Sequence, residues 1–157
     1  MTTSQTRPAA TGVRAWTAAQ RFAALFGAVY LLVAIAGFAI TGFSDFAGHH
    51  HHTLLIFAVN PLHNVVHLVL AVVWLAAAPR HHTARLANVA LGVVLGLVTV
   101  LGFVGVTDML GMSGFADPDN FLHLATATLA LYFGTAAAES ARADDEEFAA
   151  DEPEHVL

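Results

Sequence analysis

The sequence predicts an all-α protein, a four-helix transmembrane bundle, on two observations. Hydrophobic residues make up 57% of the 157-residue chain and charged residues only 11%, whereas charged residues make up about a quarter of an ordinary soluble domain. Four uncharged apolar runs also reach the roughly 18 to 20 residues that a helix needs to cross a bilayer. Helices of a soluble bundle keep a charged outer face, and these runs have none. We therefore expect a multi-pass protein of the cell membrane, with the lipid bilayer as its first partner.

The apolar runs divide the chain into an N-terminal segment, a membrane domain and a tail. The first run, 22–43, is longer than the roughly 7 to 15 apolar residues of a signal sequence, so we expect an uncleaved span. The membrane domain then covers residues 21–138 and follows a cytoplasmic segment, 1–20. Its spans are predicted at 22–43, 54–78 or 61–78, 86–106 and 120–138.

Two of the predicted helices carry a recognisable start. Asn60 followed by Pro61 is typical of a helix N-cap with proline at the first helical position, where the missing N–H costs nothing. Asp117 and Pro118 repeat the pattern before the last span. If the second span begins at Pro61, residues 54–59 form a short apolar segment at the outer interface.

The arginines predict the orientation in the membrane. All six lie before the first span, between the second and third, or after the fourth, while the other two loops carry aspartates without Lys or Arg. The positive-inside rule then places both termini in the cytoplasm. The C-terminal tail, 139–157, holds eight acidic residues and one arginine, and we expect it to be disordered and solvated.

A short repeat indicates a duplicated helical hairpin. Asn64-Val-Val-His67-Leu68 recurs 56 residues later as Asn120-Phe-Leu-His123-Leu124. A Gly-Phe pair and then an aspartate precede each copy, at 37–45 and at 102–108. Two parallel copies of one hairpin are a known route to membrane folds. An approximate two-fold axis along the membrane normal would bring the two Asn-x-x-His elements together.

Polar side chains gather within these apolar helices. From the predicted starts, His67 and His123 lie roughly 8 to 9 Å below the ends of their helices, at matching depth. Polar side chains are expensive in a membrane and therefore indicate function or a specific interhelical contact. The predicted polar cluster contains Asn60, His63, Asn64, His67, Asn120 and His123.

We favour a structural interpretation of this cluster. Asn64 or Asn120 would hydrogen-bond to His67 or His123, because neutral histidine and asparagine both donate and accept. Such bonds would fix the register of the second and fourth spans. The chain would then be a non-enzymatic accessory or scaffold protein without a cofactor, and its partners would be other membrane proteins or a second copy of the chain.

The alternative interpretation is a metal- or haem-binding membrane protein. Three neutral imidazoles, from His63, His67 and His123, can bind Zn or Cu with one coordination position open, with the asparagines orienting the rings. A closed zinc site wants a fourth ligand, and no Glu or Cys stands near in the sequence. For haem, His67 and His123 would be the axial pair.

The motifs resemble one family specifically. NPLHNVVHL at residues 60–68, DNFLHL at the start of the fourth span and the loop residues Phe46-Ala47-Gly48 are similar to a family of small four-helix membrane proteins, common in actinobacteria and catalogued only as a domain of unknown function. The resemblance covers about residues 21–138. It implies a fold and a location, and it assigns no role to the motif residues.

Other classes of function are excluded or weakly supported. The chain has no cysteine, and no phosphate loop, serine nucleophile elbow or paired carboxylates appear in a suitable context, so we expect no enzyme. The acidic balance and the lack of a basic patch exclude nucleic-acid binding. The histidines at 49–52, in the outer loop, and His81 and His82, in the inner one, are interpreted as solvated because adjacent residues cannot impose one coordination geometry.

Overall fold

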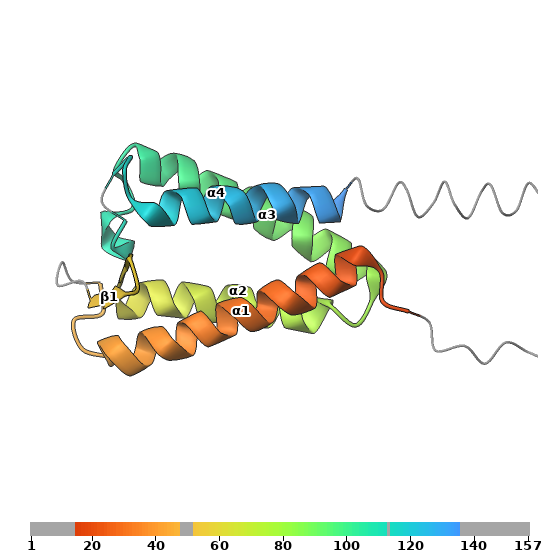
Figure 1. Cartoon of the computed structure of the whole chain (residues 1–157), viewed down its shortest axis with the longest axis horizontal. Helices are drawn as coiled ribbons and strands as arrows, with labels where there is room; N and C mark the ends of the chain where they lie inside the picture. The colour runs from red at the N-terminus through yellow and green to blue at the C-terminus, as the bar shows by residue number, and fades with distance from the viewer. Residues whose placement is uncertain (1–14, 48–51, 113, 136–157) are drawn as a thin grey trace, which may run out of the picture.

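The helices of this protein form two hairpins that lie against each other. The computed structural model describes residues 15–47, 52–112 and 114–135. In Figure 1, α1 lies beside α2 and α3 beside α4, and α1 begins at the end of the bundle where α4 ends. The elements are α1 (Ala18–Thr41), β1 (His52–Leu54), β2 (Phe57–Val59), α2 (Pro61–Ala77), α3 (His81–Phe103), the 3₁₀ turn η1 (Asp108–Leu110) and α4 (Pro118–Gly134). The predicted all-α, four-helix fold is confirmed.

Helices α2 and α4 begin where the sequence predicts. Asn60 Oδ1 accepts a hydrogen bond from the backbone N–H of His63 at 2.9 Å, and Pro61 is the first helical residue. At the start of α4, the Asp117 carboxylate accepts from the backbone N–H of Asp119 at 3.0 Å. Asn60 Nδ2 also donates to the backbone oxygen of Met109 at 2.8 Å. These caps fix the ends of the two helices that carry the polar motifs.

The connections differ from the expectation in two places. Residues 54–59 belong to an antiparallel hairpin, β1–β2, rather than to an apolar segment at the interface. Helix α3 begins at His81 rather than at residue 86, so His81 and His82 lie in its first turn and not in a loop. Apolar runs do not show such a start, because the first turn of a helix can be polar. The His81 ring also has a partner in α1, since its Nδ1 lies 2.9 Å from Thr17 Oγ1.

Two of the four helices are long and apolar enough to cross a membrane. Helix α1 has 24 residues with a mean hydropathy of 2.4, and α3 has 23 residues with a mean hydropathy of 2.3. Helix α2 is apolar but has 17 residues, because the turn at 78–80 ends it, and α4 also has 17 described residues. The rest of the predicted span 120–138, the tail 139–157 and the segment 1–14 lie outside the described residues.

The same contacts close each hairpin, which supports the predicted duplication. In each one, two glycines of the first helix lie against a leucine and an asparagine of the second, so closely that an added Cβ would clash. The glycines recur after 65 residues and their partners after 56. Small residues let helix backbones approach in this way. The four pairs are Gly27 with Leu75, Gly37 with Asn64, Gly92 with Leu131 and Gly102 with Asn120.

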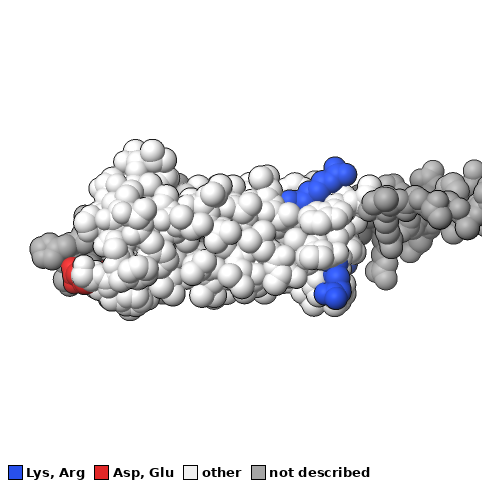
Figure 2. Space-filling model, turned by 90° about the horizontal axis from the view of Figure 1, so that it is seen from below, with Lys and Arg blue, Asp and Glu red and all other residues white. Residues whose placement is uncertain are grey.

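The bundle is apolar outside and carries its polar groups inside. Leu25, Leu32 and Leu97 are 61%, 66% and 60% exposed, whereas asparagines are fully buried. Asn88, for example, accepts from the Trp74 indole N–H at 3.1 Å and donates to a backbone oxygen of α1. Figure 2 shows uncharged residues along the length of this face, with arginines at one end and acidic residues at the other.

Candidate functional site

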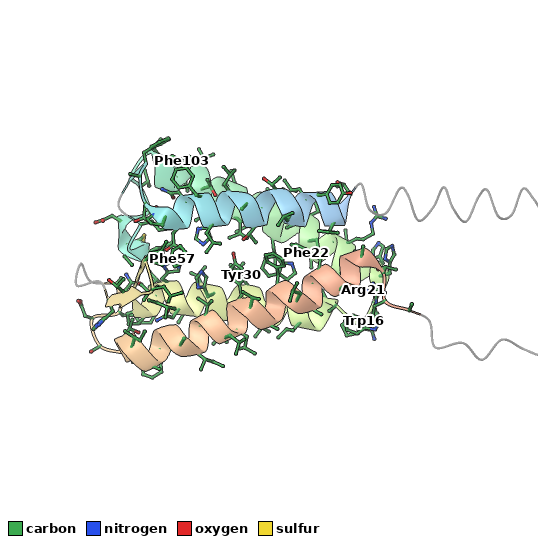
Figure 3. All side chains as sticks on the ribbon, viewed as in Figure 1. Trp16, Arg21, Phe22, Tyr30, Phe57 and Phe103 are labelled. Carbon is green, nitrogen blue, oxygen red and sulfur yellow. The ribbon has the colours of Figure 1, made fainter. Side chains whose placement is uncertain are left out.

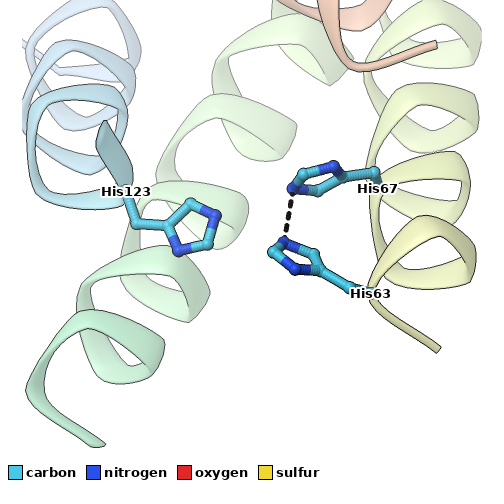
Figure 4. Close-up of side chains that lie close together, drawn as sticks. All are labelled: His63, His67 and His123. Atoms are coloured by element: carbon cyan, nitrogen blue, oxygen red, sulfur yellow. Dashed lines mark hydrogen bonds between the residues drawn. The ribbon is translucent and has the colours of Figure 1, made fainter. Parts of the chain in front are cut away.

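Three histidines meet between the two hairpins. His63 and His67 come from α2 and His123 comes from α4, which faces α2 across the bundle (Figure 4). The ring centroids of His63 and His67 are 4.4 Å apart, and each lies 6.0 Å from that of His123. All three side chains are buried. His67 and His123 thus lie close together in the interior, although each of their helices packs most closely against the other helix of its own hairpin and not, as predicted, against each other.

The local structure explains why these rings converge. His63 and His67 are four residues apart and share one face of α2. Helices α2 and α4 start at the same end of the bundle, which sets His67 and His123 at similar depth. Tyr30 of α1 makes a T-shaped ring contact with His67, with centroids 5.0 Å apart, and lies between the two hairpins in Figure 3. Sequence reasoning did not identify this tyrosine as part of the site.

Hydrogen bonds satisfy few of the ring nitrogens. His63 Nε2 and His67 Nε2 are 3.1 Å apart and form one hydrogen bond. Within the described part of the chain, the Nδ1 atoms of both rings and both nitrogens of His123 have no hydrogen-bond partner, although all are buried. Buried polar atoms are nearly always paired. The cluster is therefore incomplete as a hydrogen-bonded network.

The asparagines do not bond to the histidines, which corrects the predicted Asn–His contact. Asn64 Nδ2 donates to Thr41 Oγ1 at 3.0 Å, and Asn120 Nδ2 donates to the backbone oxygen of Gly114 at 2.8 Å. Each asparagine turns toward the first helix of its own hairpin, because Gly37 and Gly102 leave room for it there. Asn64 and Asn120 thus each stabilise their own hairpin, and Asn60 caps α2. The three histidine rings are left to contact only one another among these motif residues.

A carboxylate that the sequence reasoning missed borders the cluster. Asp119 is the second residue of α4, is 2% exposed, and places Oδ2 3.9 Å from His63 Nδ1. Neither of these two atoms has a hydrogen-bond partner among the described residues. The repeat contained a signal for this contact, because its 56-residue offset pairs Asp119 with His63.

The other described histidines lie outside this site. His52 is in β1, His81 bonds to Thr17 at the opposite end of the bundle, and His82 is exposed. The remaining histidines of the outer run, 49–51, lie outside the described residues. His52 and His82 are exposed, in agreement with the prediction, whereas His81 is half-buried and is not the solvated residue that the sequence predicted.

The geometry of the three rings suits a transition-metal ion. One nitrogen from each ring lies within 4.8 Å of the other two. In a tetrahedral zinc site, Zn–N bonds of about 2.0 to 2.1 Å put two ligand nitrogens roughly 3.3 Å apart, close to the 3.1 Å between His63 Nε2 and His67 Nε2. His123 would approach by roughly 1.5 Å to complete a three-nitrogen set. Neutral imidazole suits zinc and copper in particular.

The comparisons with known proteins give a family and no activity. The family model described as "Domain of unknown function (DUF4383)" matches residues 20–136. Neither the curated proteins nor the solved structures contain a match to this chain.

Proposed function

We propose that this protein is a four-span membrane protein that binds one transition-metal ion. The premise is that the chain belongs to the family of the domain of unknown function DUF4383. The ligands are His63, His67 and His123, and the ion is zinc or copper. Membership of the family confirms the resemblance drawn from the motifs and leaves the role of those motifs open. The proposal assigns a bound metal and, as the sequence predicts, no catalysed reaction.

The convergence of three buried imidazoles carries this proposal. One bond between two rings leaves most of the ring nitrogens without a partner in the described chain. A metal ion would accept a lone pair from each ring and make the close approach of three rings favourable. The scaffold interpretation depends on bonds from asparagine to histidine, and Asn64 and Asn120 bond within their own hairpins instead.

Haem fits the site less well than a single ion. An axial pair formed by His67 and His123 needs the flat macrocycle between the two rings. His63 Nε2 lies 3.1 Å from His67 Nε2, where the macrocycle would have to lie. The same position of His63 favours a small ion, because it adds a third nitrogen to the set.

The distribution of side chains supports four crossings of the bilayer. Large apolar side chains cover the outside while buried asparagines and histidines lie inside, which is the arrangement expected where lipid replaces water. Helices α2 and α4, with 17 residues each, are at the lower end of the roughly 17 to 25 residues that span a membrane. The arginines at one end of the bundle in Figure 2 support cytoplasmic termini.

Cysteine labelling tests this topology on a background without native cysteine. Ile56 lies at the tip of the β1–β2 hairpin and is 68% exposed, and His82 is exposed at the opposite end. A membrane-impermeant maleimide should label Ile56→Cys in intact cells and label His82→Cys only after permeabilisation. The reverse pattern, or equal labelling of both variants in intact cells, would contradict the proposed orientation.

Metal analysis tests the proposed function directly. The full chain is purified in mild detergent without chelator or nickel affinity, saturated separately with Zn²⁺ and Cu⁺, and freed of excess ion. We expect one tightly held ion per chain for at least one of the two metals, because three neutral nitrogen ligands converge there. A protein that retains neither ion, with unchanged helical content, would rule out the metal site. A Soret band in the purified protein would show that the protein binds haem rather than a single metal ion.

A further inference from the structure

We propose that Asp119 acts at the metal centre as a positioning residue beside the three histidine ligands. Its carboxylate orients His63 and supplies negative charge next to the bound cation. This rests on the proposed function and identifies the residue that completes its site. Two independent observations point to it. One is the place of the carboxylate beside His63, and the other is its position in the duplicated hairpin.

The contact with His63 has the geometry that a metal-binding histidine requires. His63 turns Nε2 toward His67, while its Nδ1 lies 3.9 Å from Asp119 Oδ2. A histidine that binds metal through Nε2 carries its proton on Nδ1 and usually donates it to a carboxylate or a carbonyl. A closure of about 1 Å brings this pair to the length of a charge-assisted hydrogen bond. This hydrogen bond would keep the proton of His63 on Nδ1, so that the lone pair of Nε2 is available to the metal.

The duplication explains why residue 119 lies opposite His63. The 56-residue offset relates Asn64 to Asn120, and both are fully buried against a glycine of their own hairpin. The positions directly before them, His63 and Asp119, are therefore equivalent in the fold. The other equivalent pair is His67 and His123. An approximate two-fold relation places equivalent positions opposite each other, so the four groups form two facing pairs.

The carboxylate also favours a cation in this part of the molecule. A buried charge is costly unless it is paired. The described arginines lie at the opposite end of the bundle (Figure 2). Three neutral imidazoles bring no charge, so an ion held by them would be neutralised in part by Asp119. One metal ion would thus bind one nitrogen of each ring and be balanced in part by the charge of the carboxylate.

Titration of the detergent-solubilised full chain with Co²⁺ tests the role of Asp119, because Co²⁺ substitutes for Zn²⁺ and its visible absorption reports the ligand geometry. Asp119→Asn should weaken Co²⁺ and Zn²⁺ binding about 10- to 100-fold, as is typical for loss of such an orienting group. Asp45→Asn is the matched control, because Asp45 is exposed in the loop after α1 and its loss should leave affinity unchanged.

Exchange of the two facing residues separates positioning from a general effect on folding. The single variants His63→Asp and Asp119→His should bind Co²⁺ at least about 10- to 100-fold more weakly than the wild type. The double variant with both changes restores three histidines and one aspartate at equivalent positions, so its affinity and absorption spectrum should return toward those of the wild type. A merely structural aspartate would give no such recovery.

The outcomes distinguish this proposal from the proposed function. If the wild type binds metal and Asp119→Asn binds it equally well, or if the exchanged double variant binds no better than His63→Asp, the role of Asp119 is overturned and the three-histidine site stands. If the wild type retains none of Zn²⁺, Co²⁺ and Cu⁺, the proposed function fails and the role of Asp119 fails with it.

Discussion

Replacement of His67 or His123 by alanine is expected to abolish stoichiometric metal binding. The two side chains come from different hairpins and face each other with ring centroids 6.0 Å apart, so each variant removes a ligand that the other hairpin cannot replace. Structural zinc sites contribute about 10 to 16 kcal/mol over four ligands, which makes the loss of one ligand worth about 3 kcal/mol. That energy corresponds to more than a hundredfold loss of affinity, measured by competition with a chromophoric chelator.

Histidines outside the cluster provide the matched controls. His82→Ala removes an exposed imidazole, and a variant with alanine at residues 49–52 removes the outer run. Both should retain one tightly bound ion per chain. Retention of the ion by His67→Ala and His123→Ala, or its loss on replacement of residues 49–52, would show that the metal binds outside the buried site.

The largest effect on folding is expected from Gly102→Ala. A Cβ at Gly102 would collide with Oδ1 of Asn120, whose amide is fully buried and donates to Gly114. Overpacking costs about 1 to 3 kcal/mol and a disrupted buried hydrogen bond adds about 1 kcal/mol. We therefore expect destabilisation by about 2 to 4 kcal/mol, or a Tm lower by roughly 5 to 15 °C, measured by circular dichroism in detergent.

Gly96→Ala is the internal control on the same helix. The atom nearest to a Cβ at Gly96 is Ala127 Cβ at 4.0 Å, so the substitution meets no obstacle and gains up to about 1 kcal/mol of helix propensity. The two alanine variants should thus shift the Tm in opposite directions. Adding Asn120→Ala should relieve part of the loss of stability caused by Gly102→Ala, because the stability effects of mutating two residues in contact are not additive. Equal Tm values for the two glycine variants would refute the asparagine–glycine contact.

Local chemistry in the sequence was enough to predict the four helices and the starts of α2 and α4. Asn60-Pro61 and Asp117-Pro118 form the expected caps because an N-cap needs only the side chain and the backbone of the next turn. The apolar runs likewise predicted the four helices. They missed the β1–β2 hairpin and the polar first turn of α3, since hydrophobicity alone does not distinguish these from a loop or an interfacial segment.

The repeat in the sequence also predicted part of the candidate site. Two equivalent Asn-x-x-His elements implied that His67 and His123 meet at an axis between the hairpins, and their rings do lie together. This worked because depth along a helix follows from residue number, at about 1.5 Å per residue. The same offset pairs His63 with Asp119, a relation that is visible in the sequence once the structure draws attention to it.

Only the tertiary structure decided which polar groups contact each other. The sequence determined that asparagines and histidines share the inner faces of two helices, and hydrogen-bonding capacity alone allowed them to bond together. In the folded chain Asn64 and Asn120 turn away to the first helices of their hairpins, into space left by Gly37 and Gly102. The direction in which each asparagine turns depends on the distance between the helix backbones. Glycine contacts across the hairpin set this distance, and no local sequence pattern encodes it. It leaves the three imidazoles facing one another.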